Sequence, residues 1–304
     1  MHASPFRIVA TSLICLAPLT GCHRAAGPQI DSPRVSPGVK MQDVTFHSAA
    51  LNRDMPYRVF LPAKMAAGQR LPVVYLLHGG DGGGYRDWSN DSDVSQYAAR
   101  GLILVMPEGA FSYYMNAALK PSEKYENYTF SDLITDVESR FPAATDREDR
   151  AVIGISMGGF AGIKIALTRP DLFVFVGALS PSVEVTQRRF KIRQIEQWLR
   201  YRKIFGPWGS NTRSSRDLFN LVTTADPAKT PFIYLTTGNE EPLYEPNRRF
   251  ASRLYQRHFA YRFHIEPGEH AWNQWDAQIP GCFESLFQHL RPMPNREPRS
   301  LATR

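Results

Sequence analysis

A run of apolar residues at 151–155 leads directly into the sequence Gly-Ile-Ser-Met-Gly-Gly at 154–159, and apolar residues at helical spacing follow as far as residue 169. A strand that turns at once into a helix pushes the residue at the turn, here Ser156, out beyond the end of the strand. The glycines supply the room that so crowded a turn needs. This setting makes Ser156 a candidate nucleophile, and the alternative is a serine that only caps the helix.

The same alternation of short apolar strands and helical patterns continues along residues 41–290. Most of the strands are apolar on both faces, which is typical of parallel strands that helices cover on each side. The pattern therefore predicts a single α/β domain with a mostly parallel central sheet. The expected strands are 57–61, 73–77, 102–106, 151–155, 173–179, 232–236 and 262–265, and the expected helices are 130–141, 157–169, 189–203, 216–222, 246–258 and 273–290.

Composition excludes several other classes of protein. The chain has 304 residues, of which 43% are hydrophobic, so it is long and apolar enough to bury a large core. Disordered, collagen-like and disulfide-stapled proteins are excluded. With 36 basic and 29 acidic residues the formal net charge is +7, a mild excess that does not indicate a nucleic-acid partner.

The first residues have the layout of an export signal. Arg7 precedes an apolar run of about 14 residues, too short for a membrane span of roughly 20 residues. The sequence Leu-Thr-Gly-Cys at 19–22 resembles the lipobox of bacterial lipoproteins, in which the chain is cut before a lipidated cysteine. Residues 1–21 are thus expected to be a signal peptide and Cys22 the lipidation site, which predicts a membrane-anchored protein of the bacterial cell envelope, periplasmic or surface facing. The alternative is an ordinary signal peptide with an incidental cysteine.

Two terminal segments look like linkers. Residues 22–40 and 291–304 are rich in proline and poor in apolar periodicity, so we expect a flexible tether and a flexible tail. Without the signal peptide, and with Cys22 lipidated, Cys282 is the one remaining thiol, and no internal disulfide is expected.

A glycine-rich loop follows the strand at 73–77 and begins with His78, Gly79 and Gly80. In α/β-hydrolases a backbone N–H from this loop joins the N–H of the residue after the nucleophile in an oxyanion hole. Gly80 and Met157 are the candidate donors. His78 is interpreted as a structural residue that orients the loop. The loop lacks the features of a phosphate-binding loop, since no Gly-Lys-Ser/Thr follows it.

The candidate base and acid lie near the C-terminus. His270 follows the last expected strand, where a hydrolase fold brings its general base to the serine. The acid is expected after the preceding strand, and two adjacent carboxylates, Glu240 and Glu241, occupy that loop. A buried carboxylate there would orient the imidazole. Charge alone does not decide between the two.

These motifs resemble the esterase D or putative-esterase family of α/β-hydrolases, which includes S-formylglutathione hydrolases, feruloyl and acetylxylan esterases and mycolyltransferases. The resemblance covers about residues 41–290 through His78-Gly79-Gly80, Trp88, the 154–159 turn, the 238–245 loop and the 268–272 loop. It implies that Glu241 takes the place of the catalytic acid, although relatives commonly have Asp there. Glu240 remains the alternative.

Residues around these motifs are candidates for a substrate pocket. Trp88, Tyr114 and Trp272 are expected to line it, or else to belong to the core. Residues 183–230 interrupt the strand and helix alternation, and Ile192, Ile195 and Leu199 form an apolar stripe with cations around it. This insertion is expected to be a lid, a surface held to anionic lipid, or a solvated helix packed on the domain.

Together the residues and the resemblance predict an exported serine esterase with a Ser-Glu-His triad, acting on small-molecule, glycan or lipid esters. An acyltransferase that uses the same acyl-enzyme is the nearest alternative, and a non-catalytic lipoprotein that binds carbohydrate or envelope is a further one. No metal-binding motif is present in the sequence, and the predicted chemistry requires neither a metal nor a cofactor. The acyl chain, the alcohol and the oligomeric state are left open.

Overall fold

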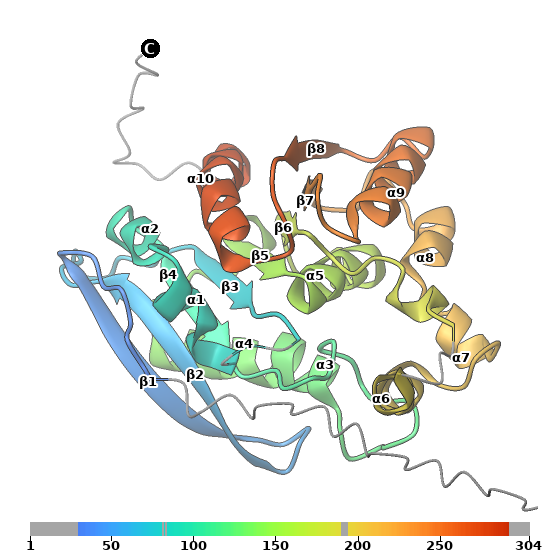
Figure 1. Ribbon diagram of the computed structural model, residues 1–304. Helices are drawn as coiled ribbons and strands as arrows, with labels where there is room; N and C mark the ends of the chain where they lie inside the picture. The colour runs from blue at the N-terminus through green and yellow to red at the C-terminus, as the bar shows by residue number, and fades with distance from the viewer. Residues whose placement is uncertain (1–29, 81, 83, 190–193, 292–304) are drawn as a thin grey trace, which may run out of the picture. The chain divides into compact units, whose positions relative to one another are not determined.

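The central strands are buried on both faces, as their uninterrupted apolar sequences predict. The computed structural model describes residues 30–80, 82, 84–189 and 194–291. Within the unit that begins at Asp31, eight strands form one sheet in the order β1-β2-β4-β3-β5-β6-β7-β8 (Figure 1). The strands are β1 (Val39–Ser48), β2 (Arg53–Pro62), β3 (Val73–Leu77), β4 (Ile103–Pro107), β5 (Arg150–Ile155), β6 (Phe175–Leu179), β7 (Phe232–Gly238) and β8 (Tyr261–Glu266).

The sheet is parallel from β4 to β8, and antiparallel pairing is confined to the β1-β2 hairpin and the β2-β4 pair. Alternate residues of each central strand enter two different cores. Val73 and Tyr75 of β3 belong to one core, whereas Val74 and Leu76 belong to the other. Helices therefore cover both faces, and the predicted α/β fold is confirmed.

Three helices, α1 (Asp87–Asp91), α2 (Ser95–Ala99) and α10 (Trp272–His289), contribute to the core that contains Val74. The other described helices lie in or near the opposite core. They are α3 (Tyr125–Asn127), α4 (Leu133–Arg140), α5 (Met157–Thr168), α6 (Ile195–Phe205), α7 (Asn211–Ser214), α8 (Leu218–Thr224) and α9 (Tyr244–Gln256). A π-helical turn, Tyr128–Asp132, joins α3 to α4, and short 3-10 turns lie at Gly84–Arg86, Arg147–Asp149 and Val185–Gln187.

The expected tether ends earlier than residue 40, and this part of the prediction is wrong. Asp31 forms an ion pair with Arg58, and the backbone N–H of Arg34 donates to the carbonyl oxygen of Ser89 at 2.7 Å. The first strand then begins at Val39. The sequence did not predict β1 because it is an edge strand whose side chains are mostly exposed, and an apolar face is therefore only weakly marked.

Several expected features lie outside the described residues. These are the signal peptide at 1–21, Cys22, the tether as far as residue 29, Ile192 and the tail from residue 292. Among the residues that are described, none of the helices combines the length and the apolar character needed to cross a membrane.

Candidate active site

Ser156 lies at the turn between β5 and α5, as the sequence predicts, and its backbone has φ 51° and ψ −107°. This conformation is strained for a residue with a side chain. The glycines on either side are required by close approach. A Cβ on Gly154 would lie 2.2 Å from the backbone carbon of Gly158, and a Cβ on Gly158 would lie 2.3 Å from the carbonyl oxygen of Leu77. The turn therefore packs directly against the end of β3.

Backbone strain gathers in the segments around this turn. Of the seven non-glycine residues with positive φ in the described chain, five lie in the turn itself, in the segment after β4 or at the end of β6: Ala110, Tyr113, Tyr114, Ser156 and Ser180. Each such residue costs of order 1–3 kcal/mol. Strain of this kind is common at functional sites.

The sheet register explains why residues far apart in the sequence meet here. The chain leaves β3 toward β4 on one side and returns to β5 on the other, so the crevice of the sheet lies beyond the paired ends Leu77 and Gly154. On the other side of β6, the end of β7 pairs with the end of β8, Gly238 with Glu266. The loops that carry His78, Ser156, Glu241 and His270 thus all follow carboxyl ends of parallel strands.

The structure brings Ser156, His270 and Glu241 into one hydrogen-bonded chain. The Oγ of Ser156 lies 2.9 Å from Nε2 of His270, and Nδ1 of His270 lies 2.5 Å from Oε2 of Glu241. Because an ionised carboxylate only accepts hydrogen bonds, Nδ1 carries a proton and donates it to Glu241. Neutral His270 then has its lone pair on Nε2, where it accepts the hydroxyl proton of Ser156.

Glu241 is placed quite differently from Glu240. Its side chain is buried, whereas Glu240 is exposed. The other carboxylate oxygen of Glu241 accepts from Oγ1 of Thr237 at 2.5 Å and from the N–H of Gly238 at 2.8 Å. Burial by itself raises the pKa of Glu241, but hydrogen bonds from His270, Thr237, Ser180 and Gly238 outweigh it and hold that pKa below its ordinary value. Glu241 is therefore ionised when it faces His270.

The loop after β3 packs against the Ser156 turn. A Cβ on Gly79 would lie 3.8 Å from Cβ of Ser156. Gly80 follows, and Met157 begins α5, so both candidate oxyanion donors are backbone groups beside Ser156. An N–H at a helix N-terminus lacks a partner within the helix, which leaves the Met157 N–H free to receive an oxyanion.

The aromatic residues expected to line a pocket occupy different environments. Trp88 and Tyr114 are each only 1% exposed, so they form the packed support of the site and no part of an open surface. For those two residues burial favours the alternative, that they belong to the core, which the sequence pattern of an aromatic residue does not distinguish from a pocket. Trp272 is partly exposed and packs edge to face on Trp88, with ring centroids 5.6 Å apart.

Three residues at the site were not predicted from the sequence. The Oγ of Ser182 lies 3.5 Å from Oγ of Ser156, and its N–H donates to the carbonyl oxygen of Ser156. Phe111 is partly exposed, and its ring lies 3.0 Å from where a Cβ on Gly80 would be. Thr237 holds Glu241. The aromatic cluster at 111–114 was the one available signal, since serine and threonine carry no distinctive pattern.

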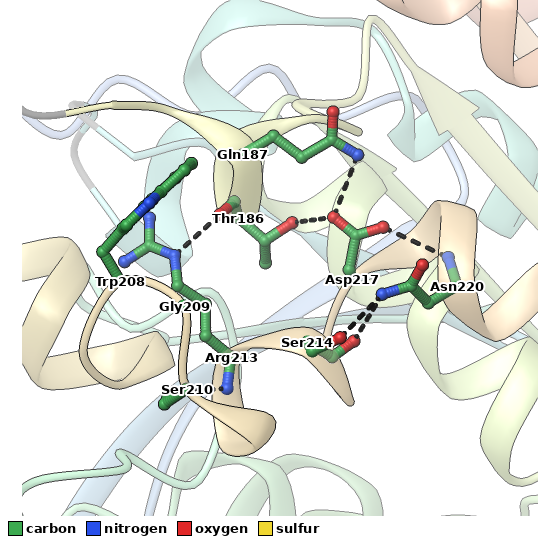
Figure 2. Close-up of a pocket in the computed structure, with 9 residues that line it drawn as sticks. All are labelled: Thr186, Gln187, Trp208, Gly209, Ser210, Arg213, Ser214, Asp217 and Asn220. Atoms are coloured by element: carbon green, nitrogen blue, oxygen red, sulfur yellow. Dashed lines mark hydrogen bonds between the residues drawn. The ribbon is translucent and has the colours of Figure 1, made fainter.

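A cavity of about 310 Å³ lies in the 183–230 insertion. Thr186 at its wall is four residues from Ser182, so its Cα lies within about 14 Å of the Cα of Ser182. Figure 2 shows Asp217 at the centre of a hydrogen-bonded group, where its carboxylate accepts from Thr186, Gln187 and the backbone of Asn220. These bonds tie residues 217–220 to the start of the insertion, which follows Ser182.

Known proteins are similar to this chain in sequence and in fold. A model of the family described as putative esterase matches residues 48–286. An acetyl esterase from Caldicellulosiruptor saccharolyticus is 27% identical over 263 residues, which cover 80% of this chain and 97% of that protein.

Two solved structures confirm the fold. Fluorophosphonate-binding serine hydrolase F from Staphylococcus aureus has a TM-score of 0.72 at 24% identity and covers 82% of this chain and 98% of its own. An S-formylglutathione hydrolase from Agrobacterium tumefaciens has a TM-score of 0.73 at 20% identity, with 86% of this chain and 99% of its own covered.

Proposed function

This chain belongs to the putative esterase family and is a carboxylic-ester hydrolase, and from that premise we propose that Ser156, His270 and Glu241 are its catalytic triad. The observation that carries the proposal is the continuous hydrogen-bonded chain from Oγ of Ser156 through the imidazole of His270 to the buried carboxylate of Glu241. The three groups hold the positions that a nucleophile, a general base and an orienting acid require.

The reaction proceeds through an acyl-enzyme. Oγ of Ser156 attacks the ester carbonyl carbon while Nε2 of His270 takes the hydroxyl proton, and the N–H groups of Gly80 and Met157 stabilise the oxyanion. The C–O bond to the alcohol then breaks, and His270 returns the proton to the leaving alkoxide. Water repeats the sequence on the acyl-enzyme, which releases the carboxylic acid and restores Ser156.

Glu241 acts through His270. Its carboxylate stabilises the imidazolium that forms in each step and selects the tautomer with the proton on Nδ1. Since the pKa of Glu241 is held below its ordinary value, the carboxylate keeps its negative charge when His270 becomes positive.

Ester hydrolysis is tested with p-nitrophenyl acetate and longer p-nitrophenyl esters. Ser156→Ala is expected to lose turnover, whereas Ser182→Ala, which removes the neighbouring hydroxyl 3.5 Å away, keeps most of it. A fluorophosphonate probe should transfer its phosphonyl group, with loss of fluoride, to the wild type and to Ser182→Ala but not to Ser156→Ala. Turnover or labelling that survives Ser156→Ala would exclude Ser156 as the nucleophile.

A second outcome of the same chemistry is acyl transfer, because an alcohol in place of water would also resolve the acyl-enzyme. Hydrolysis is preferred because a relative that matches 80% of this chain is named an acetyl esterase. Adding a soluble alcohol during turnover and measuring acid against new ester gives the partition directly. If the wild type shows no turnover and Ser156→Ala leaves its binding of a ligand unchanged, the protein is instead a binding protein.

We also propose that the protein is exported and anchored to the cell envelope through lipid on Cys22. Support comes from the apolar run and the Leu-Thr-Gly-Cys sequence at 19–22. Two or three acyl chains on one cysteine satisfy the requirement for stable anchoring. Metabolic labelling with a radioactive fatty acid should mark the wild type and not Cys22→Ala. Equal labelling of both would contradict the proposal.

A further inference from the structure

The positive charge of this chain is concentrated in one segment. Residues 188–216 contain nine Lys or Arg residues and one acid, Glu196, a net charge of +8. The whole chain has +7, so the remainder carries a net charge of −1. The described residues of this segment include α6 and α7, and Figure 1 shows the two helices next to each other. Among the described residues of this segment, Arg189, Arg200 and Arg202 are exposed, whereas Arg213 is buried.

Exposed apolar side chains gather in the same place. Ile195 and Leu199 are each 50% exposed, and their spacing of four residues puts them on one side of α6. Trp208, just beyond the helix, is also 50% exposed. Leu119 is 47% exposed and lies beside the helix end, where its N–H donates to the carbonyl oxygen of Lys203. Water-facing Ile, Leu and Trp side chains within a cationic segment need a physical reason.

The other side of α6 fixes the helix on the domain. Tyr201, Ile204 and Phe205 are buried, and the ring of Phe205 packs edge to face on Tyr113 and on Phe160 with centroids 5.1 and 5.6 Å away. The helix thus has one apolar side that completes the core and a second that faces outward. Folding of the domain accounts for the first side only.

Trp208 is held at the surface by a defined contact. Figure 2 shows its indole lying across the guanidinium group of Arg213, and the guanidinium carbon is 5.4 Å from the ring centroid. Arg213 is buried and donates to the carbonyl oxygens of Thr186 and Gly206. The ring is therefore presented outward by a rigid support.

The charge and the apolar side chains together select the partner. A second copy of the chain would bring the same exposed arginines against this surface and be repelled. A soluble polyanion would match the charge but leave Ile195, Leu199 and Trp208 in water. The surface of a bilayer that contains anionic phospholipid satisfies both, since headgroups attract the cations while the acyl boundary receives the apolar side chains.

We propose that α6 and the turn at Trp208 form a docking surface for an anionic phospholipid bilayer. The surface adjoins the active site, because the guanidinium of Arg200 lies over the ring of Phe111 at 5.4 Å and Phe111 contacts the oxyanion loop at Gly80. Docking holds the active-site loops close to the membrane surface.

The test is co-flotation with vesicles of phosphatidylcholine alone or mixed with phosphatidylglycerol. The protein is the chain from residue 23 with Cys22 and its lipid absent. This chain keeps the compact unit from Asp31, and 80% of the full sequence already matches 97% of the acetyl esterase, so it holds a complete domain. Binding is expected to the mixed vesicles, to weaken as salt is raised, and to be weak on phosphatidylcholine.

One charge-reversal variant and one apolar variant, each with a matched control, locate the surface. Arg189→Glu with Arg202→Glu reverses two exposed cations and should weaken binding by about thirtyfold or more. Leu199→Ser removes an apolar contact and should weaken it several-fold. The matched controls are Arg253→Glu with Arg257→Glu, and Tyr255→Ser, on exposed positions of α9 and the residue directly after it. Helices α7 and α8 separate α9 from α6 in Figure 1. These controls should bind as the wild type does.

Contact of Trp208 with lipid is read separately by quenching with brominated phosphatidylcholine in the mixed vesicles. The quenched signal should disappear in Trp208→Phe. Hydrolysis of p-nitrophenyl acetate in the absence of vesicles verifies that every variant is folded and does not depend on docking. Three results would overturn the proposal. The α9 controls could lose as much vesicle binding as the α6 variants, or Trp208 could show no quenching. The protein could also bind heparin as tightly as the mixed vesicles, with Leu199→Ser leaving both unchanged.

Discussion

The Nδ1 of His78 lies 2.7 Å from the carbonyl oxygen of Gly79, the residue that follows it in the chain. On the other side of the ring, Nε2 accepts the N–H of Gly109 at 2.8 Å. Because Nε2 accepts this hydrogen bond, it carries no proton, so the ring proton is on Nδ1 and is donated to the carbonyl oxygen of Gly79. The Gly79 carbonyl belongs to the same planar peptide as the N–H of Gly80, and in a trans peptide the two point in opposite directions. His78 thereby fixes the direction of a candidate oxyanion donor.

We therefore predict that His78→Ala slows catalysis more than it weakens binding. The loss of a complete oxyanion donor lowers kcat by about 10²- to 10³-fold, and a donor that is present but loosely held should cost about tenfold to a hundredfold. KM for p-nitrophenyl acetate should change little. The rate is expressed per site that reacts with a fluorophosphonate, so that unfolded protein is not counted. An unchanged rate per reactive site would show that His78 has no positioning role.

The same residue predicts a dependence of stability on pH. Burial lowers the pKa of His78 from its ordinary value of 6.5. Above pH 6.5 the residue is neutral in both the folded and the unfolded state, and the full stability is present. Below 6.5 the unfolded state binds a proton that the folded state does not, so the free energy of unfolding falls as the pH drops toward the folded pKa.

Urea unfolding at about pH 7.5 and about pH 5 measures this effect. The wild type should lose more stability between the two than His78→Gln, which has no titrating group at that position. His264, whose pKa is also lowered by burial, is present in both proteins and cancels in the comparison. Parallel losses in the two proteins would contradict the assignment.

The two adjacent glutamates are separated by a matched pair of substitutions. Glu241→Gln removes the charge that faces Nδ1 of His270 and should lower kcat by roughly a thousandfold or more, since the amide favours the wrong tautomer. Glu240→Gln, on an exposed side chain one residue away, should retain nearly full activity. A slow Glu240→Gln beside an active Glu241→Gln would reverse the assignment.

The stability of the folded domain depends on a buried arginine near its start. The side chain of Arg58 is fully buried and pairs with Asp31 and Asp43, each at 2.7 Å. Arg58→Ala removes the shared partner of the two carboxylates, which leaves Asp31 only its longer pair with Arg86 at 3.5 Å, and should lower the free energy of unfolding by about 3 kcal/mol. Arg140→Ala breaks an exposed pair with Asp136 and should have little effect. Denaturant titration of both variants measures the difference. Equal losses in the free energy of unfolding would refute it.

The parts of the fold that the sequence predicts best are those with the strongest local pattern. Strand β3 was expected at 73–77 and occurs at Val73–Leu77, because a fully buried parallel strand is apolar at every position. The turn at Ser156 was predicted because two close backbone approaches demand glycine there. The exposed strand β1 had neither signal, and it was missed.

At the site, the residue types could be predicted but their partners could not. His270 was identified from its place after the last strand, whereas the choice of Glu241 over Glu240 depends on which side chain the 238–241 turn directs inward. That direction is set by the contacts of Thr237 and Gly238, which are tertiary. Ser182 and Phe111 reach the site from loops whose paths no local pattern encodes.

The left-handed backbone of Ser156 also bears on how this protein responds to directed evolution. Glycine adopts a φ of 51° without the strain that a side chain imposes. Ser156→Gly is therefore expected to raise thermal resistance while it eliminates the nucleophile. A library screened for survival on heating alone would enrich inactive clones, so selection for a more robust enzyme has to include turnover at every round.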